Sequence, residues 1–257
     1  MIVRRAGDLA RICMQEQMMR IARPFLAVVL GLAPFAPVSP AFAGSFKPPA
    51  GCEAFLTVQS RGCRVSNHYR CSADAPGDQW RADFDQEGKF FESRIDHETQ
   101  WLESREINPP VIQTLDPGAA DPASFSELLS VGLDTFDFNL SRTDGQDTRV
   151  TGFDRLTGRS TVIDNVELQE TEFEFTETDP AGTILRQSRG HEYIHPQMRM
   201  FFSGVSEWDA GDGTWLPMDG SPRLFINPGE PGFGSTQPIF DCDPVLSLLP
   251  LDAAPRG

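Results

Sequence analysis

The sequence predicts a mainly β protein: a single antiparallel, strongly curved sheet of the half-barrel or open-barrel kind, with one short helix inserted near residues 122–131. Two observations carry this prediction. Apolar and polar residues alternate with a period of two along several segments, as in Phe136, Phe138 and Leu140, and turn-forming residues separate these segments. Only one segment has the spacing of a helix.

The first half of the chain is expected to form hairpins. Residues 52–60 and 63–71 read as two strands joined by Arg61 and Gly62, and residues 79–85 and 89–96 as two more around a glycine turn. Residues 100–106 would add a further strand. The next segment, 107–122, contains four prolines and is expected to be a loop.

The helix is predicted from its ends as well as its spacing. Asp121 is a suitable N-cap, Pro122 fits the first helical position, and Gly132 stands where the chain would leave the helix. Phe125 and Leu128 belong to an i, i+3, i+4 apolar stripe, which would cover one face of the sheet.

The second half returns to strands. Alternation over residues 133–140 precedes a strand at 149–156, and a change of parity in the next long strand predicts a β-bulge near 169–171. A turn at 179–182 leads into the strands of 183–208. Because no linker or repeat divides the chain, a single domain is predicted.

The N-terminal 43 residues have the features of a secretory signal peptide. Arg20 and Arg23 form a basic region, residues 24–35 are apolar, and a small-residue cleavage site ends at Ala43. Prolines interrupt the apolar run, which is shorter than the roughly 20 residues of a membrane span. We therefore expect cleavage after Ala43, no stable transmembrane segment afterwards, and a periplasmic or secreted protein.

Cleavage would leave residues 44–257 as one β-rich periplasmic domain, and Met18 or Met19 is an alternative start of translation. The first 43 residues hold five of the 22 basic and two of the 37 acidic residues, so the remainder carries a net charge of −18. Such a charge repels nucleic acids and anionic lipid headgroups, and it disfavours the class of nucleic-acid-binding proteins.

Four cysteines follow the predicted cleavage site, an even number that indicates two disulfides in an oxidising compartment. If residues 52–60 and 63–71 pair around Arg61 and Gly62, Cys52 lies opposite Cys71, within reach of a disulfide. The predicted pairs are therefore Cys52–Cys71 and Cys63–Cys242, which would tie the C-terminal region to the first hairpin.

The segment HEYIH, residues 191–195, matches a zinc-protease motif, in which a helix places two histidines on one face. Gly190 and Pro196 leave room for at most one helical turn, and the flanking alternation favours a strand. In a strand the two histidines are separated by about 13 Å. Zinc binding by His191, Glu192 and His195 is thus an alternative hypothesis, and no cofactor is expected.

The remaining compositional feature is 19 phenylalanines against two tyrosines, which indicates a dry interior. Its functional interpretation is an apolar groove, gated by the helix, that holds an acyl chain or a hydrophobic peptide. The candidate lining residues are phenylalanines on the predicted strands: Phe136, Phe138, Phe173, Phe175, Phe201 and Phe202.

The order of elements, a signal peptide and long antiparallel strands with a helix inserted midway, resembles the periplasmic half-barrel proteins, among them the lipoprotein carriers. The resemblance covers roughly residues 52–243 and rests on topology, without a shared motif. It implies carriage of an apolar ligand or a role in envelope assembly.

Three hypotheses follow. The first is a non-enzymatic periplasmic protein that binds or carries a lipid or hydrophobic peptide, or assists envelope assembly. The second is a zinc-dependent hydrolase that uses HEYIH. The third is a structural or adaptor protein of the cell envelope, which would present an apolar patch or a free strand edge to a partner protein.

Overall fold

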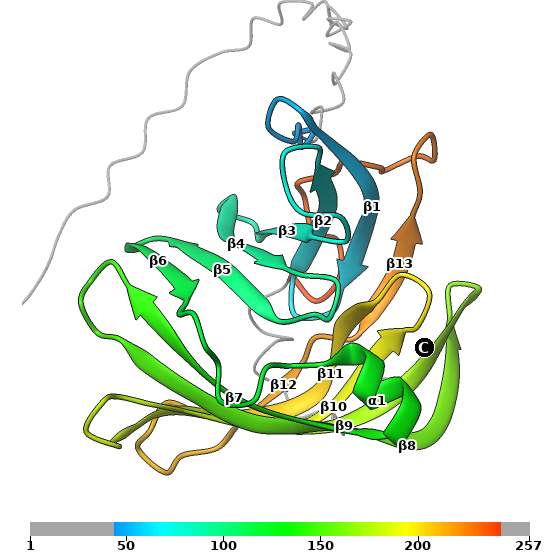
Figure 1. Ribbon diagram of the computed structural model, residues 1–257. Helices are drawn as coiled ribbons and strands as arrows, with labels where there is room; N and C mark the ends of the chain where they lie inside the picture. The colour runs from blue at the N-terminus through cyan, green and yellow to red at the C-terminus, as the bar shows by residue number, and fades with distance from the viewer. Residues whose placement is uncertain (1–43, 243–257) are drawn as a thin grey trace, which may run out of the picture. The chain divides into compact units, whose positions relative to one another are not determined.

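The computed structural model describes residues 44–242, and the predicted signal peptide and its cleavage site lie outside this range. Within this range, thirteen strands form one antiparallel sheet, with one short helix (Figure 1). The strands are β1 (Cys52–Ser60), β2 (Arg64–Cys71), β3 (Gln79–Phe84), β4 (Lys89–Ile95), β5 (Trp101–Ile107), β6 (Pro110–Leu115), β7 (Leu133–Arg142), β8 (Thr148–Ile163), β9 (Val166–Thr178), β10 (Ile184–His195), β11 (Met200–Asp209), β12 (Leu216–Asp219) and β13 (Pro222–Ile226).

Each strand from β1 to β12 pairs with its neighbours in the chain, and β13 pairs with β1. The two edges of the sheet, β12 and β13, therefore follow each other in sequence, joined only by Gly220 and Ser221. The Gly220 N–H donates to Gly204 O of β11, while Ser221 O accepts from the N–H of Arg61 beside β1. The sheet is not closed, because β12 and β13 do not pair. The prediction of a mainly β, single open sheet is confirmed.

One predicted loop is wrong. The segment 107–122 contains β6, which pairs with both β5 and β7. Its first residue, Pro110, occupies a strand position at which a proline is tolerated, and the alternation of buried Val111 and Gln113 with exposed neighbours follows. The many prolines of this segment led to the prediction of a loop where the chain forms a short strand.

Helix α1 (Phe125–Val131) lies within the predicted range but begins later than expected. Its N-cap is Ser124, whose side chain accepts a hydrogen bond from the Glu127 N–H. Asp121, the predicted cap, instead forms a β-bridge with Asp137 through hydrogen bonds in both directions. This bridge holds Asp121 extended and delays the helix by three residues. The helix ends at Gly132 in the left-handed conformation, as predicted.

The predicted irregularity near residues 169–171 is present, but the extra residues belong to the neighbouring strand. Leu156 of β8 lies opposite Thr171, whereas Ser160 lies opposite Gln169, so the register shifts between Leu156 and Ser160. The predicted long strand is in fact two strands, because a two-residue turn at Asp164 and Asn165 separates β8 from β9. Leu168 packs in the cluster of Leu56 and Val58, and Phe173 stacks on Phe175.

Both faces of β1 and β2 are buried. A register shift between Ala54 and Leu56 places Leu56 and Val58 in one apolar cluster, with Met200 and Phe202 among their neighbours. The other face carries a second cluster that holds Val65, Tyr69, Trp80, Ala82 and Phe84, with Phe46 packed against it. The hairpin therefore lacks the single dry face that strict alternation would produce.

Both predicted disulfides are present: Cys52–Cys71 joins β1 to β2, and Cys63–Cys242 spans 179 residues of sequence. Next to the second disulfide, Arg61 forms ion pairs with Asp219 and Asp241. The segment 227–242, which we call the C-terminal strap, covers buried polar side chains of the first hairpin. Its backbone or side-chain partners there are Thr57, Gln59 and Asn67.

Candidate functional site

Four of the six predicted groove residues come together, and two lie elsewhere. Phe136, Phe138 and Phe175 belong to one apolar cluster, and Phe173 stacks on Phe175 at a ring separation of 6.4 Å. By contrast, Phe201 packs against α1, and Phe202 lies in the cluster of Leu56 and Val58. Phe201 and Phe202 are consecutive residues of β11, so their side chains point to opposite faces of the sheet. Ligand binding by the six phenylalanines stays a prediction.

A tryptophan that the sequence did not single out completes the aromatic group. Trp101 of β5 packs edge-on against Phe138 at 5.6 Å and against Phe175 at 5.9 Å between ring centroids. It is 37% exposed, so these rings form a partly open aromatic surface. We call the face of β7–β11 that carries Phe138 and Phe175 the inner face.

Moving along the inner face away from Trp101, the side chains become charged. Phe175 lies opposite Ser188, Phe173 opposite Gly190, and Thr171 opposite Glu192. From Ser188 to Glu192 these three rows cover four residue steps of β10, roughly 13 Å. The inner face therefore passes from aromatic rings to a carboxylate within a distance that one small amphipathic molecule could bridge.

Two carboxylates on this face have no partner among the described side chains. Glu192 of β10 lies opposite Ser203, and Asp154 of β8 lies opposite Phe173. Both are half-buried, so some of their surface stays accessible, but the surrounding protein excludes most water. Burial raises the pKa of Glu192 to about 7, against the opposing effect of Arg81 and Arg64. Burial, followed by repulsion from Glu192, raises the pKa of Asp154.

Arginines of β2 and β3 lie close enough to Glu192 to oppose the effect of burial on its pKa. Nη2 of Arg64 donates to Ser203 Oγ at 3.0 Å and to Gly220 O at 3.5 Å. Nε of Arg81 lies 3.1 Å from Asp83 Oδ2, and the other oxygen of Asp83 accepts from the Ser66 hydroxyl at 2.6 Å. Arg81 is thus compensated by a buried carboxylate, whereas Arg64 contacts only neutral oxygen atoms.

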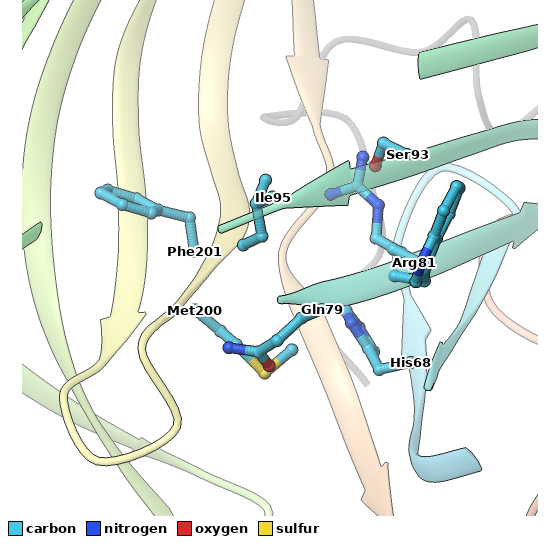
Figure 2. Close-up of a pocket in the computed structure, with 8 residues that line it drawn as sticks. His68, Gln79, Arg81, Ser93, Ile95, Met200 and Phe201 are labelled. Carbon is cyan, nitrogen blue, oxygen red and sulfur yellow. The ribbon is translucent and has the colours of Figure 1, made fainter. Parts of the chain in front are cut away.

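A small cavity of about 50 Å³ opens beside this group of charges (Figure 2). Figure 2 shows the Arg81 side chain extending toward Ser93, its opposite residue on β4. Burial lowers the pKa of His68 to about 3, so the imidazole is neutral near pH 7, and its Nε2 is buried without a hydrogen-bond partner. The lining residues are His68, Gln79, Trp80, Arg81, Ser93, Ile95, Met200 and Phe201.

The size of this cavity limits what it can hold. A drug-sized ligand occupies roughly 300–1,000 Å³, whereas a cavity of this volume takes a few water molecules or one polar group. The inner face therefore offers an aromatic surface with a charged end and a small cavity beside it. A larger pocket of about 480 Å³ lies beside β13, and none of the aromatic group lines it. Its lining residues are Asp164, Asn165, Val166, Leu224, Phe225, Ile226, Asn227, Glu230 and Pro231.

Sequence reasoning missed Trp101, Arg64, Arg81 and Asp154, and it considered Glu192 only as a metal ligand. Arg64 and Arg81 occupy alternating positions next to apolar neighbours, as outward-facing residues of a half-exposed sheet also do. The sequence did contain one usable signal. Once the hairpins are paired, Arg64 and Arg81 fall on the same face of β2 and β3, and they would be buried if both faces of the sheet were covered.

The segment HEYIH lies at the end of β10, so the expected strand is confirmed and the metalloprotease helix does not form. His191 Nδ1 lies 3.4 Å from Glu170 Oε1, and His195 Nδ1 accepts from the Met198 N–H at 3.2 Å. Within residues 44–242, no cluster of three or more histidine, cysteine, aspartate or glutamate side chains could hold a metal ion.

Both free edges of the sheet are protected against strand addition. On β13, the Phe225 N–H donates to Asp164 Oδ2 at 2.8 Å, and just beyond it the Asn227 N–H donates to Glu230 Oε2 at 2.6 Å. The other edge, β12, has only four residues and contains Pro217, which lacks a donor. Carboxylates, proline and short length are recognised devices that prevent edge-to-edge pairing. The adaptor hypothesis in its strand-edge form gains no support from these edges.

No protein-family model, no curated protein and no solved structure matches this chain. Among the described residues, no helix has the length and apolar character needed to cross a membrane. The interpretation of the site thus depends on its own chemistry: guanidinium donors, carboxylates of raised pKa and an open aromatic surface.

Proposed function

We propose that this chain is an exported, non-enzymatic protein that binds a small amphipathic ligand on the inner face of its open sheet. The aromatic group of Trp101, Phe138 and Phe175 holds the apolar part of the ligand, and the charged end of the face receives its polar part. The observation that carries the proposal is the partly exposed Trp101 packed against two phenylalanine rings.

The physical basis is the energy of apolar burial. Covering an exposed aromatic side chain contributes about 1–3 kcal/mol, and edge-on aromatic pairs keep the ring in place before the ligand arrives. Export is supported by the two disulfides and by the predicted signal peptide. An envelope protein as partner is a further hypothesis, which no feature of the described residues favours over a small ligand.

The first test is native mass spectrometry of the mature protein purified from a bacterial periplasm. We expect a chain that begins at Gly44, contains two disulfides, and carries a co-purifying amphipathic molecule. A chain that retains residues 1–43, or that stays reduced in this compartment, would contradict export.

The aromatic surface is tested by the variant Trp101→Ala, measured with a neutral fluorescent naphthylamine probe. We expect about tenfold weaker probe binding, because the variant removes the exposed ring of the group. The matched control is Phe90→Ala, which removes an aromatic ring of similar exposure, 40%, from β4 outside this group. Equal affinity of both variants and the parent protein would place the apolar ligand elsewhere.

A further inference from the structure

Arg64 carries a charge that no carboxylate in contact compensates. Its Nη2 donates to the neutral oxygens of Ser203 and Gly220, whereas its Nε is buried without a hydrogen-bond partner. Within residues 44–242 it forms no ion pair. Buried charges in proteins are usually paired, because an isolated charge in a medium of low polarity is costly. Arg64 therefore differs from its neighbour Arg81, which forms an ion pair with Asp83.

Burial lowers the pKa of Arg64, and Asp83 and, to a smaller extent, Glu192 oppose this from a distance, but neither forms an ion pair with it. Asp83 already pairs with Arg81. Burial favours the neutral form of Glu192, so this carboxyl group is a poor counter-ion for the arginine. Glu192 and Arg64 both approach Ser203, one as its opposite residue in the sheet and the other as its hydrogen-bond donor. A gap thus separates a guanidinium from the carboxyl group that would otherwise neutralise it.

We infer that Arg64 binds the carboxylate of a single-chain amphiphile, such as a fatty acid, whose chain runs along Phe173 and Phe175 toward Trp101. This inference deepens the proposed function and rests on it. The chain direction follows from the sheet, since Glu192, Gly190 and Ser188 mark three successive rows that end beside Phe175.

The charge of the site selects the head group. One uncompensated guanidinium matches one negative charge, and its planar donors suit the two oxygens of a carboxylate. Asp154 and Glu192 line the same face, and Asp83 already binds Arg81 and Ser66. Arg64 alone would leave the second negative charge of a phosphate dianion without a counter-charge, so a phosphate dianion is disfavoured.

The test compares two probes with the same chain, dodecanoate and dodecanol, by isothermal titration calorimetry below their micellar concentrations. The parent protein is expected to bind dodecanoate more tightly than dodecanol. Arg64→Gln should weaken dodecanoate binding by about 10- to 100-fold and leave dodecanol binding unchanged, because a charge-assisted hydrogen bond is lost. At pH 6, where burial keeps most of Glu192 protonated, Glu192→Gln should bind dodecanoate as the parent protein does.

The matched control is Arg189→Gln, on the same strand as Glu192, where the arginine is exposed and pairs with Glu207. It should bind both probes as the parent protein does. If dodecanol and dodecanoate bind equally and Arg64→Gln changes neither, the carboxylate site is overturned while the apolar surface stands. If neither probe binds, the proposed function and this inference both fail.

The stability of the ligand-free variant separates a binding role from a structural one. An arginine retained for a ligand leaves an unpaired buried charge in the free protein, so Arg64→Gln should unfold at the same urea concentration as the parent protein or at a higher one. Marked destabilisation of the free variant, together with unchanged dodecanoate affinity, would show that Arg64 serves the fold.

Discussion

At the scale of single residues, burial decides the chemistry of this protein more than residue type does. Asp83 and Glu192 are both acidic residues on strands, yet Asp83 accepts hydrogen bonds and pairs with Arg81, whereas Glu192 has no described partner and a pKa of about 7. His68 is neutral because its surroundings exclude water. Such differences arise from the neighbours that the fold supplies.

The raised pKa of Glu192 predicts a loss of stability with increasing pH. Its ordinary value is 4.5, so between pH 4.5 and about 7 the folded protein holds this proton more firmly than the unfolded chain does. This contribution is present below pH 4.5 and is lost as the pH rises through 7, by roughly 2–3 kcal/mol.

Urea unfolding at pH 5 and pH 8 measures this effect. The free energy of unfolding should fall less between the two values in Glu192→Gln than in the parent protein, because glutamine does not titrate. Asp134, whose pKa burial raises to about 6, titrates in both proteins and cancels in the comparison. The same pH dependence in both proteins would show that Glu192 has an ordinary pKa.

At the scale of elements, local signals described the hairpins well and the ends of elements less well. The turn that precedes β4, the C-terminal end of α1 at Gly132 and the pairing of Cys52 with Cys71 all follow from nearby residues. The start of α1 does not, because Asp121 is held by a bridge to a strand that follows the helix. The strand β6 was not predicted because its segment is rich in proline, although a proline is tolerated at the first position of a strand.

The protection of the β13 edge by Asp164 can be tested by mutation. Asp164→Gly keeps the left-handed conformation of the turn, where φ is 49°, but removes the carboxylate that accepts from Phe225 N–H. We expect a loss of about 1 kcal/mol in the free energy of unfolding and concentration-dependent self-association by analytical ultracentrifugation.

The control for this variant is Asn165→Gly, in the same turn at a φ of 63°. It should stay monomeric wherever the parent protein does. If Asp164→Gly sediments like this control at every concentration, the carboxylate does not protect the edge.

At the scale of the whole molecule, long-range links hold the two ends of the described chain to the first hairpin. The C-terminal strap satisfies the buried polar groups of Thr57, Gln59 and Asn67, and Cys63–Cys242 anchors its end. Without the strap these groups would lose their partners in a region where water is excluded, at a cost of about 1–3 kcal/mol for each buried group.

Removal of the two disulfides should therefore have unequal effects. In the chain-entropy account, a cross-link that spans 179 residues stabilises by about 5 kcal/mol and one that spans 19 residues by about 3 kcal/mol. The pair Cys63→Ser and Cys242→Ser should lower the free energy of unfolding more than Cys52→Ser and Cys71→Ser, measured in urea. The opposite order would show that the strap contributes little.

The sequence by itself determined the mainly β class, the single sheet, the short helix and both disulfides. Alternation, turn residues and the Cys52–Cys71 hairpin are local signals, and of the four cysteines only Cys63 and Cys242 then remain to pair. The tertiary structure alone decided which phenylalanines meet, that Trp101 joins them, and that Arg64 lies unpaired near Glu192. These relations join strands far apart in the chain. They depend on one-residue register shifts, such as those at Gly190 and Ala54, which reverse the face a side chain occupies.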